Sequence, residues 1–113
     1  MKTNLIIGAG QLGSRHLQGL LRAQWKQRIF LLDPSFESLK LSEERAKEIK
    51  HNHEIIYSSD WTELPQTFDL AIIATGANVR EMVVSNLLQN YKILNLVLEK
   101  VLFQKLNSYG NIK

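Results

Sequence analysis

The chain has 113 residues, of which 44% are hydrophobic and 22% are charged, and its formal net charge is +3. This size and composition are typical of one globular domain and argue against a disordered chain. Cysteine is absent, which excludes disulfides, thiolate nucleophiles and cysteine-ligated metals. Basic and acidic residues are interleaved, as in residues 43–48, so the small positive charge does not indicate a nucleic-acid partner.

The sequence also argues against a membrane partner. The N-terminal apolar run is too short for a signal peptide, and no apolar run approaches the roughly 20 residues that cross a bilayer. We therefore expect a cytoplasmic protein, which also fits the absence of cysteine.

Short aliphatic runs predict the strands. Runs of this kind, apolar on both faces, are typical of parallel strands that are covered on both sides. A weaker candidate lies at residues 54–57. The four strong runs are residues 5–7, 29–32, 70–74 and 93–98.

Apolar residues at helical spacing separate these runs and predict three helices. Asn78, followed three residues later by Glu81, predicts a capping box at the start of the third helix. Pro65 breaks any helix in the irregular stretch from 58 to 68. The three apolar stripes are Leu12, His16, Leu20 and Leu21; Phe36, Leu39, Ala46 and Ile49; and Val79, Met82, Val83 and Leu87.

The order of these elements predicts the fold class. Strands alternate with helices, and a loop or short helix separates the third strand from the fourth. Right-handed crossovers then give an α/β, doubly wound parallel sheet of the Rossmann type with strand order 3-2-1-4-5. We expect one three-layer domain over residues 1–113.

A glycine-rich loop directly after the first strand predicts a dinucleotide site. Gly8, Gly10 and Gly13 match the pattern G-x-G-x-x-G, with Gln11 and Leu12 between the last two glycines. The first glycine permits the tight turn, the second lets a diphosphate approach the backbone, and the third lets the helix pack closely on the strand. The unpaired N–H groups at the start of the helix then face the phosphates.

Asp33 predicts which dinucleotide binds. It ends the second strand about 20 residues after Gly13, the spacing of the dinucleotide fingerprint. Its carboxylate can accept both hydroxyls of the adenosine ribose but would repel a 2′-phosphate. A pair of like charges about 4 Å apart costs on the order of 4 kcal/mol at an effective dielectric near 20. Pro34 and Ser35 follow, rather than an arginine that could pair with the phosphate. The sequence therefore favours NAD over NADP.

Three motifs resemble the Gfo/Idh/MocA oxidoreductases. They are the glycine loop with His16 three residues beyond Gly13, the strand 69–75 that ends in Thr75, and Glu99 with Lys100 after the fifth strand. The resemblance spans residues 4 to about 103. It implies cofactor contacts after the fourth and fifth strands, namely Ala74, Thr75, Gly76 and Glu99.

The same resemblance implies a catalytic role for Lys100, which would contact the substrate hydroxyl. Members of the family oxidise or reduce a carbon of a sugar or cyclitol, passing hydride to or from the nicotinamide. Two features depart from the family pattern. Val101 replaces the usual proline, and Arg80 follows Thr75 where a Pro or Asn followed by a nearby histidine is more common.

The resemblance also bears on domain organisation and partners. The family places most substrate-binding residues in a C-terminal α/β domain, so we expect this chain to be the NAD-binding domain of an oxidoreductase, truncated before that domain. A sugar-like small molecule would then be the partner besides the dinucleotide. The alternative is a stand-alone regulatory domain that senses NAD(H) without catalysis. Self-association through an exposed sheet edge stays open.

No metal site is expected from the sequence. His51, His53 and Glu54 lie close together, but their spacing offers no third ligand in a suitable position.

Overall fold

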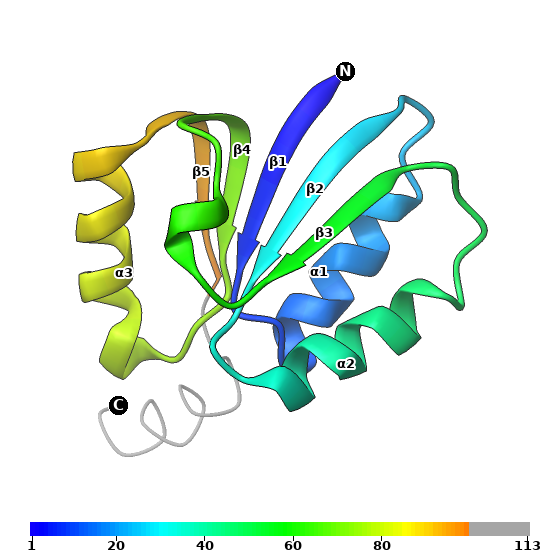
Figure 1. Ribbon diagram of the computed structural model, residues 1–113, viewed down its shortest axis with the longest axis horizontal. Coiled ribbons are helices and arrows are strands. Elements are labelled where there is room, and N and C mark those ends of the chain that lie inside the picture. The colour runs from blue at the N-terminus through cyan, green and yellow to red at the C-terminus, as the bar shows by residue number, and fades with distance from the viewer. Residues whose placement is uncertain (100–113) are drawn as a thin grey trace, which may run out of the picture.

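The computed structural model describes residues 1–99, which form one parallel sheet with helices on both faces (Figure 1). The strand order is β3-β2-β1-β4-β5. Both the predicted α/β fold class and the predicted strand order are confirmed. In chain order the elements are β1 (Lys2–Ile7), α1 (Gln11–Leu21), β2 (Gln27–Leu32), α2 (Phe36–Ala46), β3 (Glu54–Ser58), the short 3₁₀ helix η1 (Trp61–Glu63), β4 (Thr67–Ile73), α3 (Ala77–Asn90) and β5 (Lys92–Leu98).

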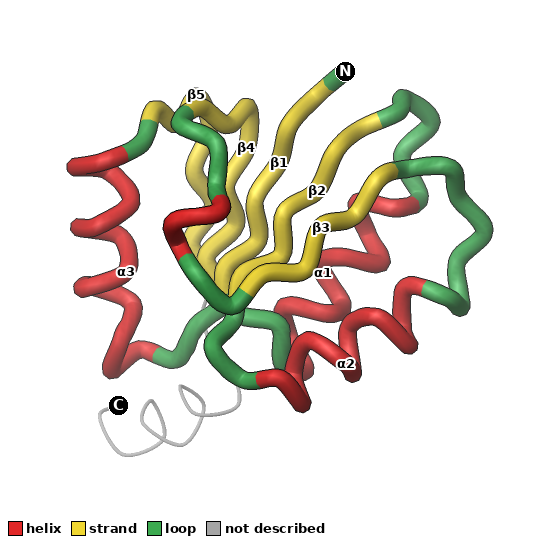
Figure 2. Tube along the Cα trace, viewed as in Figure 1, coloured by secondary structure: helices red, strands yellow, loops and turns green. Residues whose placement is uncertain are grey.

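The register brings the ends of the strands together. Ile7, the last residue of β1, pairs with Leu32 of β2 on one side and with Ile73 of β4 on the other. The carboxyl ends of all five strands converge at one edge of the sheet (Figure 2). The chain moves outward from β1 to β3 and then returns to β4 on the other side of β1. This reversal is the place where open α/β sheets bind ligands.

Each face of the sheet has its own apolar core. Alternation along β1 sends Leu5 and Ile7 to one core and Ile6 to the other. The helices divide in the same way, with α3 and η1 over the first face and α1 and α2 over the second (Figure 1). The helical residues buried in the two cores include Leu87 of α3 in the first, and Leu17, Leu21, Leu39 and Ala46 in the second.

The buried stripe of α1 differs from the predicted one. Leu21 is buried as predicted, but Leu17, which the predicted stripe omits, is buried too, together with Ser14 and Gln18. Leu12, His16 and Leu20 are only half-buried. The two buried polar side chains hydrogen-bond to Arg45, the Ser14 hydroxyl to its guanidinium and the Gln18 amide to its carbonyl. A pattern that counts only apolar residues misses this stripe, because its polar members are satisfied by another helix.

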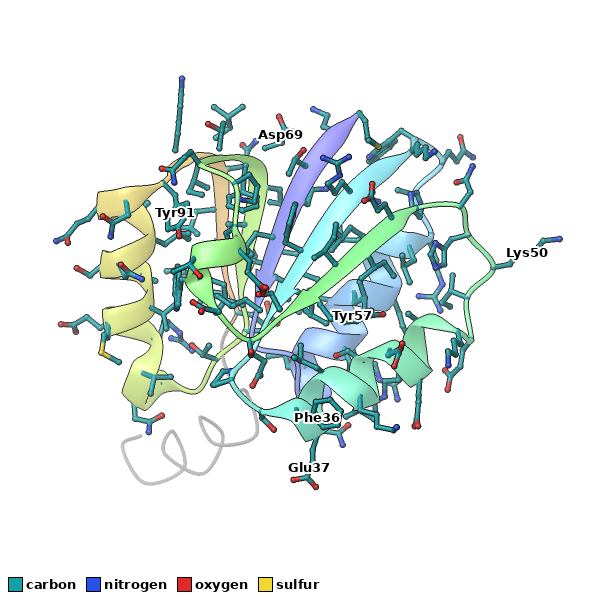
Figure 3. All side chains as sticks on the ribbon, in the orientation of Figure 1. Phe36, Glu37, Lys50, Tyr57, Asp69 and Tyr91 are labelled. Carbon is teal, nitrogen blue, oxygen red and sulfur yellow. The ribbon has the colours of Figure 1, made fainter. Side chains whose placement is uncertain are left out.

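Two residues predicted to face the core are exposed. Phe36 is 76% exposed at the first position of α2, where it projects from the carboxyl edge of the sheet (Figure 3). Met82 is 69% exposed, because α3 packs through Val83, Val84 and Leu87 instead. Both residues fit the apolar periodicity. Which apolar residues of a helix are buried therefore depends on how the helix is rotated about its axis when it packs on the sheet.

The predicted capping box of α3 is wrong. The helix begins at Ala77 with Gly76 as its N-cap, so Asn78 is already the second helical residue. No side chain caps this N-terminus. The physical reason is the short turn after β4: the strand ends at Ile73, and the chain becomes helical within a few residues.

The contact between α1 and the glycine turn predicts the outcome of two glycine substitutions. A Cβ on Gly13 would lie 1.5 Å from the carbonyl oxygen of Gly8, whereas a Cβ on Gly19, in the same helix, would meet nothing within 4 Å. We expect Gly13→Ala to lower the free energy of unfolding by roughly 3 kcal/mol or more, because the backbone must separate. Gly19→Ala should raise it by about 0.5–1 kcal/mol. Urea unfolding of both variants measures the difference, and equal stabilities would contradict this packing.

Candidate functional site

The turn from β1 into α1 is dictated by contacts within the protein at two of its glycines. Gly8 has a φ of +101°, and a Cβ there would lie 2.9 Å from the carbonyl carbon and oxygen of Ala74. Its N–H donates to the carbonyl of Leu32 at 2.8 Å. Gly13 packs against the same turn from the helix side. Backbone therefore lies directly on backbone here, which only glycine permits.

Gly10 is not required by any such contact. A Cβ on this residue would meet nothing within 4 Å, and its φ of −69° lies outside the left-handed region that favours glycine. The space in front of it lies at the start of α1, whose first turn has no acidic residue and no side-chain cap. Free N–H groups and the positive end of the helix dipole therefore face an open volume, as an anion site requires.

Asp33 lies against the glycine loop. Its Oδ2 accepts a hydrogen bond from the N–H of Ala9 at 2.7 Å, and its Oδ1 accepts one from the N–H of Ser35 at 2.8 Å. The carboxylate is therefore fixed beside the loop rather than turned into solvent. Each carboxylate oxygen can accept two hydrogen bonds, so each retains capacity for one more.

The turn after β4 forms the next wall of the site. The N–H of Ala74 donates to the carbonyl of Ile7 at 2.8 Å, which places this turn beside the glycine loop. Thr75 and Gly76 follow it, and Gly76 is the N-cap of α3. The hydroxyl oxygen of Thr75 is buried and has no hydrogen-bond partner among residues 1–99. A buried hydroxyl without a partner indicates a missing ligand group or water.

Glu99 connects several elements at the end of β5. Its N–H donates to the carbonyl of Ile73 at 2.9 Å, and its carbonyl accepts from the guanidinium of Arg80 at 3.0 Å. Its carboxylate lies 3.7 Å from Nε2 of His16. Sequence reasoning did not foresee the role of Arg80, since a contact across 19 residues between a helix and a strand end has no local signal.

The structure therefore brings the predicted cofactor residues to one edge of the sheet. Gly8, Gly10, Gln11, Leu12 and Gly13 form the loop and the first turn of α1, Asp33 follows β2, Ala74, Thr75 and Gly76 follow β4, and Glu99 follows β5. Lys100, the predicted catalytic residue, lies outside the described residues, as does Val101.

A hollow of about 420 Å³ opens between α2, β3 and η1. Phe36, Tyr57 and Ser58 are among the residues that line it, and the carbonyl of Ser58 accepts the N–H of Asp33 at 3.0 Å. Burial, together with the charge of Glu43, raises the pKa of Tyr57 to about 12, so this phenol stays protonated at neutral pH. Figure 3 shows Phe36 and Tyr57 on neighbouring elements, α2 and β3.

The histidines before β3 have a different environment. Nδ1 of His53 accepts from the N–H of Gln27 at 3.3 Å, and Nε2 lies 3.0 Å from the carbonyl of Leu21. Both ring nitrogens of His53 are thus engaged by the main chain. The pKa of the stacked His51 is lowered by burial and by His53. Within residues 1–99, no three His, Asp or Glu side chains gather as a metal site would require.

A comparison with protein families decides the identity of the domain. The model of the family described as "Oxidoreductase family, NAD-binding Rossmann fold" matches residues 2–109. The chain belongs to the Gfo/Idh/MocA oxidoreductase family. This confirms the resemblance seen in the sequence and assigns a nicotinamide dinucleotide as the cofactor class. A regulatory sensing domain is not favoured.

The comparison with curated proteins and the lengths of the helices add little to this assignment of the Gfo/Idh/MocA domain. No curated protein matches the chain. Within residues 1–99, every helix is too short or too polar to cross a membrane.

The features of the edge fit the cofactor of the family. The space in front of the Gly10 Cα is open, and the turn after β4 presents a buried hydroxyl that has no hydrogen-bond partner within residues 1–99. The amides of the loop and the N-terminus of α1 would hold the diphosphate, and Asp33 would hold the adenosine ribose.

Gly10→Ala separates the binding role of the loop from its folding role. The new methyl group has free space in the protein but would occupy the volume that a diphosphate needs. We expect at most about 1 kcal/mol change in the free energy of unfolding, with a Kd for NADH raised by about tenfold or more. Urea unfolding and calorimetric titration measure the two quantities. An unchanged Kd would show that the dinucleotide does not approach this residue.

Proposed function

We propose that this domain binds NAD, in preference to NADP, for hydride transfer at a hydroxyl-bearing carbon of a sugar or cyclitol. The observation that carries the proposal is the carboxylate of Asp33, held at 2.7 Å from the N–H of Ala9 in the glycine loop. A bound nicotinamide supplies the acceptor or donor of the hydride. The residues of this chain bind and orient the two ends of the cofactor.

The adenosine end supports the preference for NAD. The two oxygens of Asp33 each have one backbone donor and room for one more hydrogen bond, which matches the two hydroxyls of a ribose. A 2′-phosphate would bring a second negative charge to the same place. Within residues 1–99, no basic side chain pairs with Asp33 to offset that repulsion. The attached adenine would enter the hollow that Ser58 helps to line.

The part of the site at the ends of β4 and β5 supports a role in hydride transfer. Thr75 and Glu99 lie at the carboxyl ends of β4 and β5, across the switch point from Asp33. The hydroxyl of Thr75, which has no partner in the described part of the chain, would donate a hydrogen bond to the carboxamide of the nicotinamide or accept one from it. Lys100 follows Glu99 directly, and its Nζ would take the proton from the substrate hydroxyl as hydride leaves the carbon.

The sugar or cyclitol specificity rests on the resemblance of Glu99 and Lys100 to the family motif. A lysine next to the cofactor can exchange a proton with an alcohol near neutral pH when its pKa is lowered.

Asp33→Asn tests the cofactor preference. The substitution keeps the size of the side chain and removes the charge, so hydrogen bonds to the ribose weaken and repulsion of a 2′-phosphate disappears. We expect the Kd for NADH to rise by about 10- to 100-fold and the preference for NADH over NADPH to shrink. Asp69→Asn is the matched control, because Asp69 also accepts a backbone N–H, from Thr3 at 2.9 Å, at the opposite edge of the sheet (Figure 3). Equal affinities of the unmodified protein for NADH and NADPH would contradict the assignment.

Lys100→Met tests the catalytic role. In a protein that includes the C-terminal substrate domain implied by the family resemblance, removing the proton acceptor should lower the rate of NAD reduction by about 100-fold or more, while the Kd for NADH stays within a factor of two. Initial rates with a panel of sugars and cyclitols, alongside calorimetric titration, measure both effects. A variant that reduces NAD as fast as the parent would exclude Lys100 as the base.

A further inference from the structure

Arg45 extends from the last turn of α2 to the first turn of α1. Its Nη1 donates to the hydroxyl of Ser14 at 2.7 Å and to the carbonyl of Gln11 at 3.2 Å. Its Nη2 donates to the side-chain oxygen of Gln11 at 2.7 Å. The two helices lie side by side on one face of the sheet (Figure 1). The guanidinium is therefore fixed by three neutral oxygens next to the glycine loop.

Arg45 lies in the last turn of α2, where a basic residue is favourable, and its guanidinium reaches the N-terminus of α1. The N-terminus of a helix carries the positive end of its dipole, so a cation there is repelled, and acids are the residues that suit it. The first turn of α1 has no acidic residue. Within residues 1–99, no carboxylate lies within 4.0 Å of the guanidinium.

A second contact from α2 supports a role in the loop. Ser42 is fully buried, and its hydroxyl donates to the carbonyl of Ala9 at 2.7 Å, while Asp33 accepts the N–H of the same residue. Arg45 donates to the carbonyl of Gln11, two residues further along the chain. Both carbonyls are thus bonded to side chains of α2. The loop is fixed in one conformation before any ligand arrives, which lowers the entropic cost of binding.

We propose that Arg45 belongs to the diphosphate site of this domain, as a positioning residue that orients Gln11 and supplies positive charge beside the first turn of α1. The inference rests on the proposed function, because it needs a dinucleotide in front of the loop. The diphosphate of the ligand would supply the negative charge that balances both the guanidinium and the positive end of the α1 dipole. A purely structural role, in which Arg45 only joins α1 to α2, predicts no dependence on the phosphates of the ligand.

Arg45→Met tests the proposal in the full 113-residue chain. Methionine keeps most of the aliphatic volume and removes the charge and the hydrogen bonds. The ligands are adenosine, which has no phosphate, and ADP-ribose, which has the diphosphate but no nicotinamide. We expect the Kd for ADP-ribose to rise by about 3- to 30-fold and the Kd for adenosine to stay within a factor of two.

Two further measurements distinguish charge from structure. The affinity of the parent for ADP-ribose should fall more steeply with added salt than that of Arg45→Met, because one favourable charge has been removed. Arg45→Lys should recover part of the lost affinity. Arg28→Met is the matched control: Arg28 pairs with Glu54 at 3.0 Å on the neighbouring strands β2 and β3, and its loss should change neither Kd.

Each outcome decides the proposal. If Arg45→Met binds ADP-ribose as tightly as the parent, or loses affinity for adenosine and ADP-ribose by the same factor, Arg45 has no role at the diphosphate. That result would leave NAD binding by the domain intact. If the unmodified chain binds neither ADP-ribose nor NADH, the proposed function fails and this inference fails with it.

Discussion

The contact between Gly8 and Gly13 is the constraint on which the rest of the structure depends. The carbonyl of Gly8 occupies the place where any other residue at position 13 would have its Cβ. This closeness lets α1 begin directly above the end of β1 and beside the turn after β4. The free N–H groups of the helix are thereby brought to the switch point of the sheet, where open α/β folds bind their ligands.

Polar contacts from outside the loop then set its conformation. Asp33 holds the N–H of Ala9 and Ser42 holds its carbonyl, so both hydrogen-bonding groups of this one residue are bonded to side chains. These contacts come from the end of β2 and from α2. If the same carboxylate binds the ribose, as proposed, it couples the shape of the loop to recognition of the cofactor. Substitution of Asp33 is therefore expected to affect both.

The opposite half of the edge is built around Glu99. Its backbone is bonded to β4 and to Arg80 of α3, and its carboxylate faces His16 of α1. Nε2 of His16 and Nε of Arg80 are buried and have no hydrogen-bond partner among residues 1–99. Polar atoms of this kind are costly unless a ligand or water completes them. Their position at the ends of β4 and β5 fits the proposal that the nicotinamide half of the cofactor binds there.

The sequence by itself determined the fold class, the strand order and the glycine loop with Asp33, because strand and helix periodicities and glycine spacing are local properties of the chain. Only the tertiary structure decided which side chains complete the site. Arg45, Ser42 and Arg80 reach it from helices, and no local pattern encodes those distances. The rotation of each helix on the sheet also depends on packing, which left Phe36 and Met82 exposed although both fit the apolar spacing.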